Sequence, residues 1–101
     1  MVQIKVQSIE LIGEQISILF DKAWFQEDIT TLSQLLLSIL PEHSIKETTI
    51  GADRECVRFM WSNAEFMLNF DYYSQSCWFS ALDKVSTAQI QPVYNALINH
   101  V

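Results

Sequence analysis

The sequence predicts an α+β domain in which two helices pack on one face of an antiparallel sheet of five or six strands. Three observations lead to this fold class. Five segments alternate apolar and polar residues, which is the period of half-buried strands. Two other segments repeat apolar residues at three- and four-residue steps, as amphipathic helices do. Each element therefore has one apolar side, and the elements bury these sides by packing as two layers.

The length and charge of the chain limit the classes of protein to which it can belong. Its 101 residues are the length of a single domain, 1–101, and half of them are apolar, which excludes disorder for the bulk of the chain. Twelve acidic residues against six basic ones give a net charge of −6. Such a chain is repelled by phosphate backbones and by anionic membrane surfaces. No apolar run approaches the roughly 18 residues of a membrane span, and no targeting segment is visible. We therefore expect a cytoplasmic protein that binds neither nucleic acid nor membrane.

The first two strands are expected to form a hairpin. Apolar and polar residues alternate over residues 2–7, and Ile16, Ile18 and Phe20 alternate likewise with Gln15, Ser17 and Leu19. Gly13 lies between these segments and can supply the positive φ of a hairpin turn. The alternation slips at Ser8 and Ile9, which indicates a β-bulge.

A helix is expected from Asp28 to about Leu40. Apolar residues three and four positions apart form one stripe, beginning at Ile29. The Asp28 side chain is expected to cap the free amides of the first turn. Pro41 disfavours helical geometry in the residue before it, so the helix ends near Leu40.

A short strand over residues 45–50 is followed by three strands with strongly apolar faces. The breaks between these three fall at Ser62-Asn63 and Ser74-Gln75, which both tolerate turns. A two-residue loop at each break matches the apolar faces across both hairpins, and a slip of one residue would destroy the match. The facing pairs expected in this register are Phe59 with Phe66, Val57 with Leu68, Phe70 with Phe79, and Leu68 with Ala81.

The C-terminal segment has helical spacing from Ile90 to Val101. Ser86 with Gln89 three residues later is the pattern of a capping box. Pro92 leaves two alternatives, because it lacks a backbone donor and crowds the preceding turn. Either the helix is kinked, or a short first turn precedes a helix that begins at Pro92, where proline is favourable. The second alternative is preferred.

No set of residues in the sequence forms a recognisable catalytic site. Cys56 and Cys77 are expected on opposite faces with one strand between them, about 10 Å apart, which is beyond the roughly 7 Å limit for bridged α-carbons. His43 and His100 lie near helix C-termini, where the helix dipole explains them. Two glycines cannot build a phosphate-binding loop. We expect no catalytic, cofactor-binding or metal-binding residues. The alternative is a small enzyme with a pocket between helices and sheet, using His43 or Asp71.

The second face of the three apolar strands is the candidate functional surface. In the expected register Arg54 lies opposite Asp71, Asp71 lies opposite Trp78, and Met67 lies opposite Leu82. A solvated sheet face ordinarily carries more charge, whereas arginine, tryptophan and methionine are enriched at interface centres. The predicted interaction face consists of Arg54, Arg58, Met60, Met67, Asp71, Trp78 and Leu82.

Three alternatives remain open for this face. A loop covers it, for example the loop that carries Trp24 and Phe25, or a second copy of the chain binds it, or a different protein does. The function predicted from the sequence is a non-catalytic protein-interaction domain that acts as a homodimer or as a small binding partner.

The chain also resembles a known family. The segments Phe59-Met60-Trp61, Asn69-Phe70-Asp71-Tyr72 and Cys77-Trp78-Phe79 are similar to those of a small family of bacterial proteins of about 100 residues, which is a domain of unknown function. The resemblance extends over the whole chain and implies an aromatic three-stranded meander with a C-terminal helix. It implies a bacterial source and no assigned activity, so it transfers no functional residue.

Overall fold

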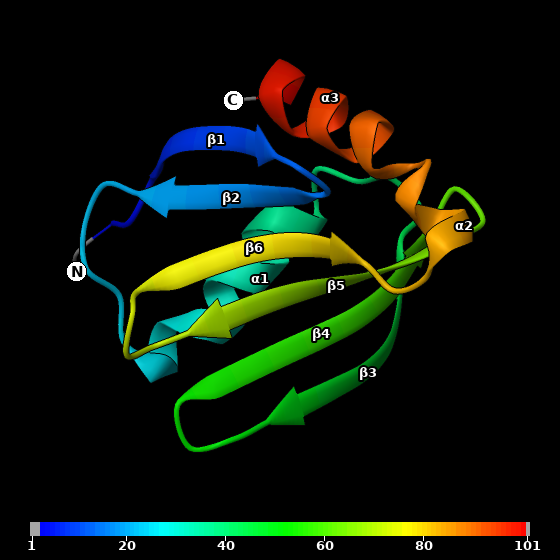
Figure 1. Ribbon diagram of the computed structural model, residues 1–101. Helices are drawn as coiled ribbons and strands as arrows, with labels where there is room; N and C mark the ends of the chain where they lie inside the picture. Colours follow the sequence, from blue (N-terminus) through cyan, green and yellow to red (C-terminus); the bar gives the residue numbers. More distant parts are fainter. Residues whose placement is uncertain (1–2, 101) are drawn as a thin grey trace.

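The computed structural model describes residues 3–100 and confirms the α+β fold class (Figure 1). Val2 and Val101, which the sequence patterns included, lie outside the described residues. The strands are β1 (Val6–Ile12), β2 (Gln15–Phe20), β3 (Ser44–Ile50), β4 (Arg54–Trp61), β5 (Ala64–Asp71) and β6 (Ser76–Ala81). The helices are the 3-10 turn η1 (Gln26–Asp28), α1 (Ile29–Leu37), α2 (Lys84–Thr87) and α3 (Ile90–His100).

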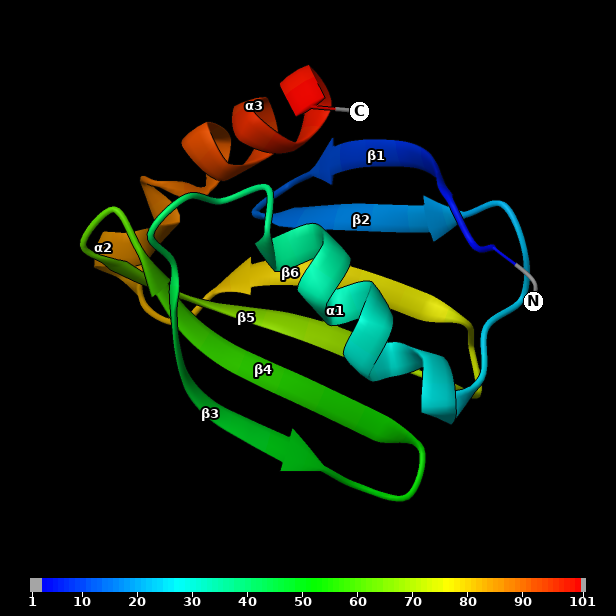
Figure 2. The same ribbon diagram turned by 180° about the vertical axis from the view of Figure 1, so that it is seen from behind.

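The six strands form one antiparallel sheet in the order β1-β2-β6-β5-β4-β3. Helix α1 lies across one face of the sheet (Figure 2), while α3 lies along β1 and β2 and α2 contacts β5 and β6. The buried side chains of α1 and α3 join one cluster with the apolar sheet face. The sheet contributes to that cluster Ile16, Ile18, Phe20, Val57, Phe59, Ala64, Phe66, Leu68, Phe70, Cys77 and Phe79.

The N-terminal hairpin forms as the sequence predicts. Gly13 adopts φ +61° in the turn between β1 and β2, a conformation that costs glycine little because it has no Cβ. The register of the pair shifts between Val6 and Ser8, so the predicted bulge lies within one or two residues of its expected place. Pairing begins at Val6, later than the alternation at residue 2 suggested.

Helix α1 differs from the prediction at both ends. Asp28 is the last residue of η1 and makes no side-chain cap to α1; its Oδ2 instead accepts a hydrogen bond from the Phe25 amide at 2.8 Å. The expected N-cap role is therefore wrong, because the carboxylate is already engaged by the preceding turn. The helix ends at Leu37, but the amides of Ile39 and Leu40 continue with bonds to carbonyls three residues back.

The β4–β5 hairpin has the predicted register, with Phe59 opposite Phe66 and Val57 opposite Leu68. Ser62 and Asn63 both adopt positive φ, 55° and 63°. Two successive residues in this conformation form the two-residue turn that matches the twist of an antiparallel pair. The Phe59 and Phe66 rings stack at 5.6 Å between centroids.

The predicted register of the β5–β6 hairpin is wrong by two residues. Phe70 faces Cys77 and Leu68 faces Phe79. The strands pair only as far as Asp71 and Ser76, so four residues form the loop. Asp71 Oδ1 accepts from the Ser74 amide at 3.3 Å, and the Gln75 amide donates to Tyr72 O at 3.2 Å. These bonds stabilise a loop of four residues, whereas the sequence predicted a loop of two. A shift of two keeps every side chain on its predicted face.

The helical C-terminal segment begins with a cap at Asp83, three residues before the predicted cap at Ser86. Asp83 is the N-cap of α2, where its Oδ1 accepts from the Ser86 amide at 2.7 Å, and hydrogen bonds from Ser86 lower the pKa of the Asp83 carboxyl. Ser86 is buried inside α2, and its Oγ accepts from the Glu65 amide, so the predicted capping box with Gln89 does not form. Helix α3 begins at Ile90, not at Pro92 as preferred from the sequence, but Pro92 lies in its first turn, where a missing amide costs no helical hydrogen bond.

Both cysteines are free, as the sequence predicts. Cys77 is buried in the core, and burial raises the pKa of its thiol well above the ordinary range. Cys56 is half-buried on the opposite face of the sheet.

We expect a thiol reagent to modify Cys56 but not Cys77 in the native protein, because only an accessible thiolate reacts. Intact mass after brief labelling measures the number of adducts. A single native adduct that maps to Cys56, and two adducts in denaturant, is the predicted result. Native labelling at Cys77 would contradict the packing of β6, and a mass two hydrogens light without labelling would indicate a disulfide.

Candidate interaction face

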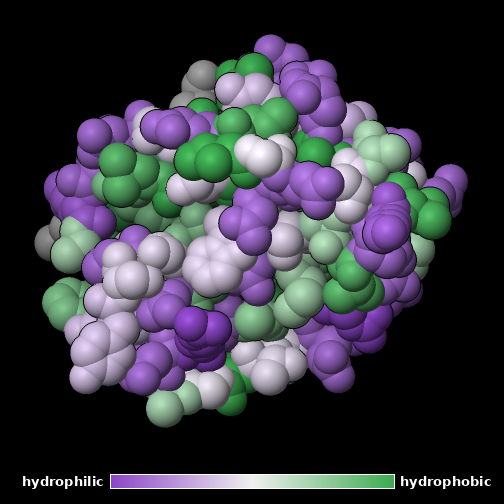
Figure 3. Space-filling model, viewed as in Figure 1, coloured by the Kyte–Doolittle hydropathy of each residue, from purple (hydrophilic) through white to green (hydrophobic). Residues whose placement is uncertain are grey.

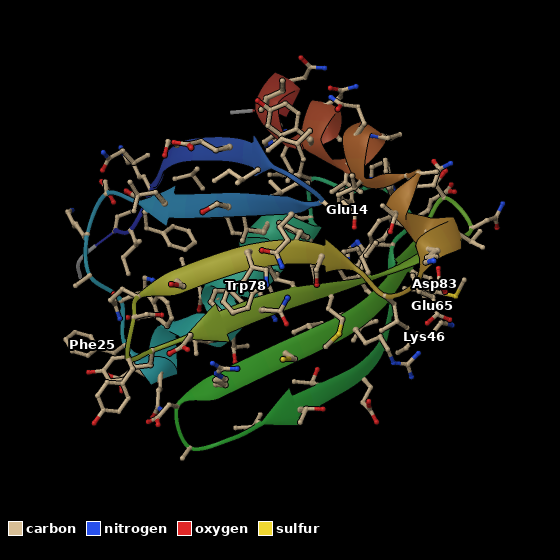
Figure 4. All side chains as sticks on the ribbon, in the orientation of Figure 1. Glu14, Phe25, Lys46, Glu65, Trp78 and Asp83 are labelled. Atoms are coloured by element: carbon tan, nitrogen blue, oxygen red, sulfur yellow. The ribbon has the colours of Figure 1, made fainter. Side chains whose placement is uncertain are left out.

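The sheet face opposite α1 is open to solvent over its central strands. Figure 1 looks onto this face, and no helix among residues 3–100 lies across β4, β5 and β6. The loop proposed as its cover lies elsewhere. Trp24 is 2% exposed and contacts Phe70 on the core side, edge to face at 5.6 Å between centroids. Phe25 lies beyond the strand ends, away from Trp78 (Figure 4). The loop carrying Trp24 and Phe25 therefore does not cover this face.

The open face, here called the outer face, presents mixed chemistry in its middle. Pale and green surface gathers between purple side chains in Figure 3, without a continuous apolar patch. Trp78, Met60 and Met67 are half-buried, as is usual for large side chains lying on a bare sheet. This composition is typical of a non-obligate protein interface, where apolar anchors lie among polar groups.

Trp78 lies closer to Met67 on the outer face than predicted. Because of the two-residue shift, Trp78 is opposite Asn69 instead of Asp71, and Met67 is opposite Ser80 instead of Leu82. Trp78 and Met67 are now in adjacent rows of side chains, whereas the prediction placed them two rows apart. The structure therefore brings these two anchors together as diagonal neighbours across β5 and β6.

The side-chain amide of Asn69, which lies opposite Trp78, forms hydrogen bonds to residues of β4, β5 and β6. Asn69 is 8% exposed, and its Nδ2 donates to Trp78 O at 3.3 Å, to Ser80 Oγ at 3.2 Å and to Met67 O at 3.4 Å. Its Oδ1 accepts from Cys56 Sγ at 3.2 Å. Since both ends of the amide have partners, the residues around Trp78 have a fixed arrangement.

The two predicted arginines are each paired with carboxylates. Arg54 lies opposite Asp71, as predicted, and its Nε is 3.2 Å from Asp71 Oδ2. Arg58 lies between two strands, with Nη1 3.3 Å from Glu65 Oε2 and Nε 3.9 Å from Glu47 Oε1. These pairs are partly exposed, so they contribute little to stability. They hold two guanidinium groups on either side of Met67 and Asn69.

The remaining predicted residues lie at one end of the outer face. Met60 is opposite Glu65 on β4. Leu82 follows the end of β6, and its amide donates to Glu65 O at 2.9 Å. Both therefore flank Glu65, one row beyond Met67, and the seven predicted residues form one connected surface.

Sequence reasoning missed the half of the outer face that β2 supplies. Strand β2 pairs with β6, which places Ser17 directly opposite Trp78. A shallow groove of about 520 Å³ runs between these strands and is lined by Ile12, Gln15, Ser17, Leu19, Ser74, Ser76 and Trp78 among others. The alternation of residues 15, 17 and 19 with the buried Ile16, Ile18 and Phe20 already indicates that they share the other face of the sheet. It does not place them beside Trp78, because the sequence does not show that β2 pairs with β6.

A comparison with protein families bears on what this surface does. A family model described as a protein of unknown function (DUF3630) matches residues 6–93. The chain belongs to this family. The match confirms the resemblance to a domain of unknown function, and it includes every residue of the outer face named above. No curated protein and no solved structure matches the chain.

The two side chains considered for catalysis in this DUF3630 domain both have structural partners. His43 Nδ1 lies 2.9 Å from Leu40 O, after the end of α1. Asp71 binds Arg54 and the loop amide of Ser74.

The helices described between residues 3 and 100 include none long and apolar enough to cross a membrane.

Proposed function

We propose that this DUF3630 domain is a non-catalytic protein-interaction domain that binds a protein partner through its outer face. The observation that carries the proposal is the diagonal placement of Trp78 beside Met67 on a sheet face that residues 3–100 leave uncovered. Burying one indole and two or three aliphatic side chains removes enough apolar area to contribute several kcal/mol at about 25 cal/mol per Å².

The charged residues around these anchors support specificity. Arg54 with Asp71 and Arg58 with Glu65 present fixed, paired charges next to the apolar centre. A rim of this kind selects a partner with complementary charges and adds less to affinity than the anchors do. The fixed Asn69 network keeps the anchors in place before binding, which lowers the ordering cost of association.

Replacing Trp78 and Met67 together by serine is expected to abolish partner binding while the domain stays folded. Both side chains lie on the open face and neither belongs to the buried cluster. The measurement compares the tagged parent with the variant in pull-downs from the native host and in size-exclusion chromatography, with circular dichroism to check folding. Loss of a specific bound protein, with an unchanged spectrum, is the predicted result.

A control variant removes two exposed apolar side chains from the helices, both more exposed than Trp78 and Met67. Leu35→Ser with Ile98→Ser changes the exposed apolar area of α1 and α3 and leaves the outer face intact. The control should bind like the parent. If the control loses the partner and the Trp78 variant keeps it, the helical side is the interface. Unfolding of the Trp78 variant would instead assign Trp78 to the core.

A further inference from the structure

Strand β3 is open along its outer edge and on both faces. Within residues 3–100 it is the terminal strand of the sheet, with β4 as its one neighbour. All seven of its residues are exposed, including the apolar Ile45 and Ile50. Figure 2 shows that α1 lies over the middle of the sheet, and its first residue, Ile29, lines a pocket with Ile50 at the end of β3. The opposite edge differs, because α3 lies against β1.

The hydrogen-bond pattern shows which groups of β3 face outward. In an antiparallel pair, bonding residues alternate along each strand. The Gly51 amide donates to Arg54 O at 2.7 Å, so every second residue from Gly51 faces β4. Thr48 and Ile50 therefore point their amide and carbonyl groups away from the sheet. Beyond the irregularity in β3, Ile45 points outward as well.

A bulge in β3 changes which of its residues lie on the same face of the sheet. One extra residue, Lys46, lies between Ile45 and Glu47, where the register with β4 shifts. Residues three apart ordinarily lie on opposite faces of a strand. Here Ile45 and Thr48 lie on the same face, because their partners Phe59 and Val57 both belong to the core side. Both also point their backbone groups outward.

We propose that β3 pairs antiparallel with β3 of a second copy of this chain, with Ile45 of each copy opposite Thr48 of the other. In this register the core-side faces of the two sheets lie on the same side. The outward amide and carbonyl groups of Ile45 in one copy also meet those of Thr48 in the other. It also places Lys46 of each copy opposite Glu47 of the other, so two ion pairs form around the two-fold axis.

Charge is the reason to choose a second copy as the occupant. A lysine in the middle of an edge strand ordinarily prevents pairing with other strands. Opposite a glutamate, the same lysine favours one partner and one register. The adjacent, opposite charges of Lys46 and Glu47 are self-complementary only in an antiparallel pair. Backbone hydrogen bonds supply the affinity, as in other cases of strand addition.

The dimer goes beyond the proposed function and does not depend on it. A two-fold axis perpendicular to the sheet joins the two sheets edge to edge and leaves both outer faces on the same side. Trp78 and Met67 remain free in each copy. The dimer would thus bind a partner with two sites at once, which increases avidity.

Charge reversal tests the register. Lys46→Glu and Glu47→Lys each place like charges opposite one another, and each should weaken the dimer by about tenfold or more in sedimentation equilibrium. The combined variant K46E/E47K restores opposite charges across the two-fold axis and should dimerise more tightly than either single variant, although it loses the contact between Arg58 and Glu47. Lys84→Glu makes the same charge change on α2 and should have no effect. A double variant as weak as the singles would overturn the proposed register.

A proline variant tests the edge itself. Thr48→Pro removes an amide that faces outward and therefore costs no bond to β4, whereas Thr49→Pro removes one that faces inward. The first variant should be monomeric with a native circular dichroism spectrum, and the second should be destabilised. A parent that is monomeric at all concentrations, or a Thr48→Pro variant that still dimerises, would refute the proposal. So would loss of the dimer in the Trp78 and Met67 variant, which tests the outer face separately.

Discussion

Replacing Trp24 by alanine is expected to lower the free energy of unfolding by about 3–5 kcal/mol, the usual cost of removing a large buried ring. Trp24 is the largest side chain in the buried cluster. Its ring contacts Phe70 at 5.6 Å and Tyr72 at 6.3 Å between centroids, in edge-to-face geometry. These contacts connect the segment before α1 to β5, so the loss reaches two parts of the fold.

Urea unfolding followed by circular dichroism measures this effect, with Phe25→Ala as the control. Phe25 is adjacent in the chain and equally apolar, but 54% exposed. Its replacement should cost much less than that of Trp24. Equal losses at the two positions would mean that Trp24 is not packed against Phe70, and that the loop before α1 is free to lie over the outer face.

Replacing Asn69 by aspartate is expected to destabilise the protein strongly at neutral pH. The substitution is isosteric, but it puts a carboxylate oxygen where Nδ2 now donates to Trp78 O and Met67 O. A buried carboxylate that faces acceptors has a raised pKa. Below the pKa of about 3.9 that aspartate has in the unfolded chain, both states are protonated and no ionisation penalty applies. The penalty grows as the pH rises from there to the folded pKa, and is constant above it.

Unfolding midpoints measured between pH 4 and pH 7 test this dependence. Asn69→Asp should lose stability relative to the parent as the pH rises across this range. Asn69→Ala removes the hydrogen bonds without adding a charge, and should cost about 1–3 kcal/mol at every pH. If the aspartate and alanine variants respond alike to pH, the Asn69 amide is not enclosed as the structure shows.

Local pattern was enough to predict the strands, their faces and the hairpin at Ser62-Asn63. Each of these depends on residues close together in the chain: alternation sets the face, and two residues with positive φ set the turn. The hairpin at Ser74-Gln75 failed because side-chain bonds decide its loop length. The Gln75 side chain bonds the Trp24 backbone at both N and O, 2.9 Å each, a contact that a local pattern cannot reveal.

For the outer face, too, local pattern predicted some features, whereas others depend on contacts between distant segments. Its strand residues were predicted on the side of the sheet where they lie, since a shift of two leaves faces unchanged. The rows were not, because the neighbours of Trp78 depend on register. The pairing of β2 with β6 joins segments about 60 residues apart and follows from the match of Ile16 with Phe79 only when the whole sheet is assembled. The Asp28 cap failed because a preceding turn competes for its carboxylate.

Site-specific photocrosslinking in the native host tests most directly whether the outer face binds a protein. Leu19, which is 50% exposed and lines the groove beside Trp78, is replaced by a photoreactive residue, and Leu35 on α1, 44% exposed, serves as the control. We predict a discrete protein adduct from position 19 that disappears when Trp78 and Met67 are serine, and none from position 35. An adduct from position 35 with none from position 19 would contradict a binding role for the outer face.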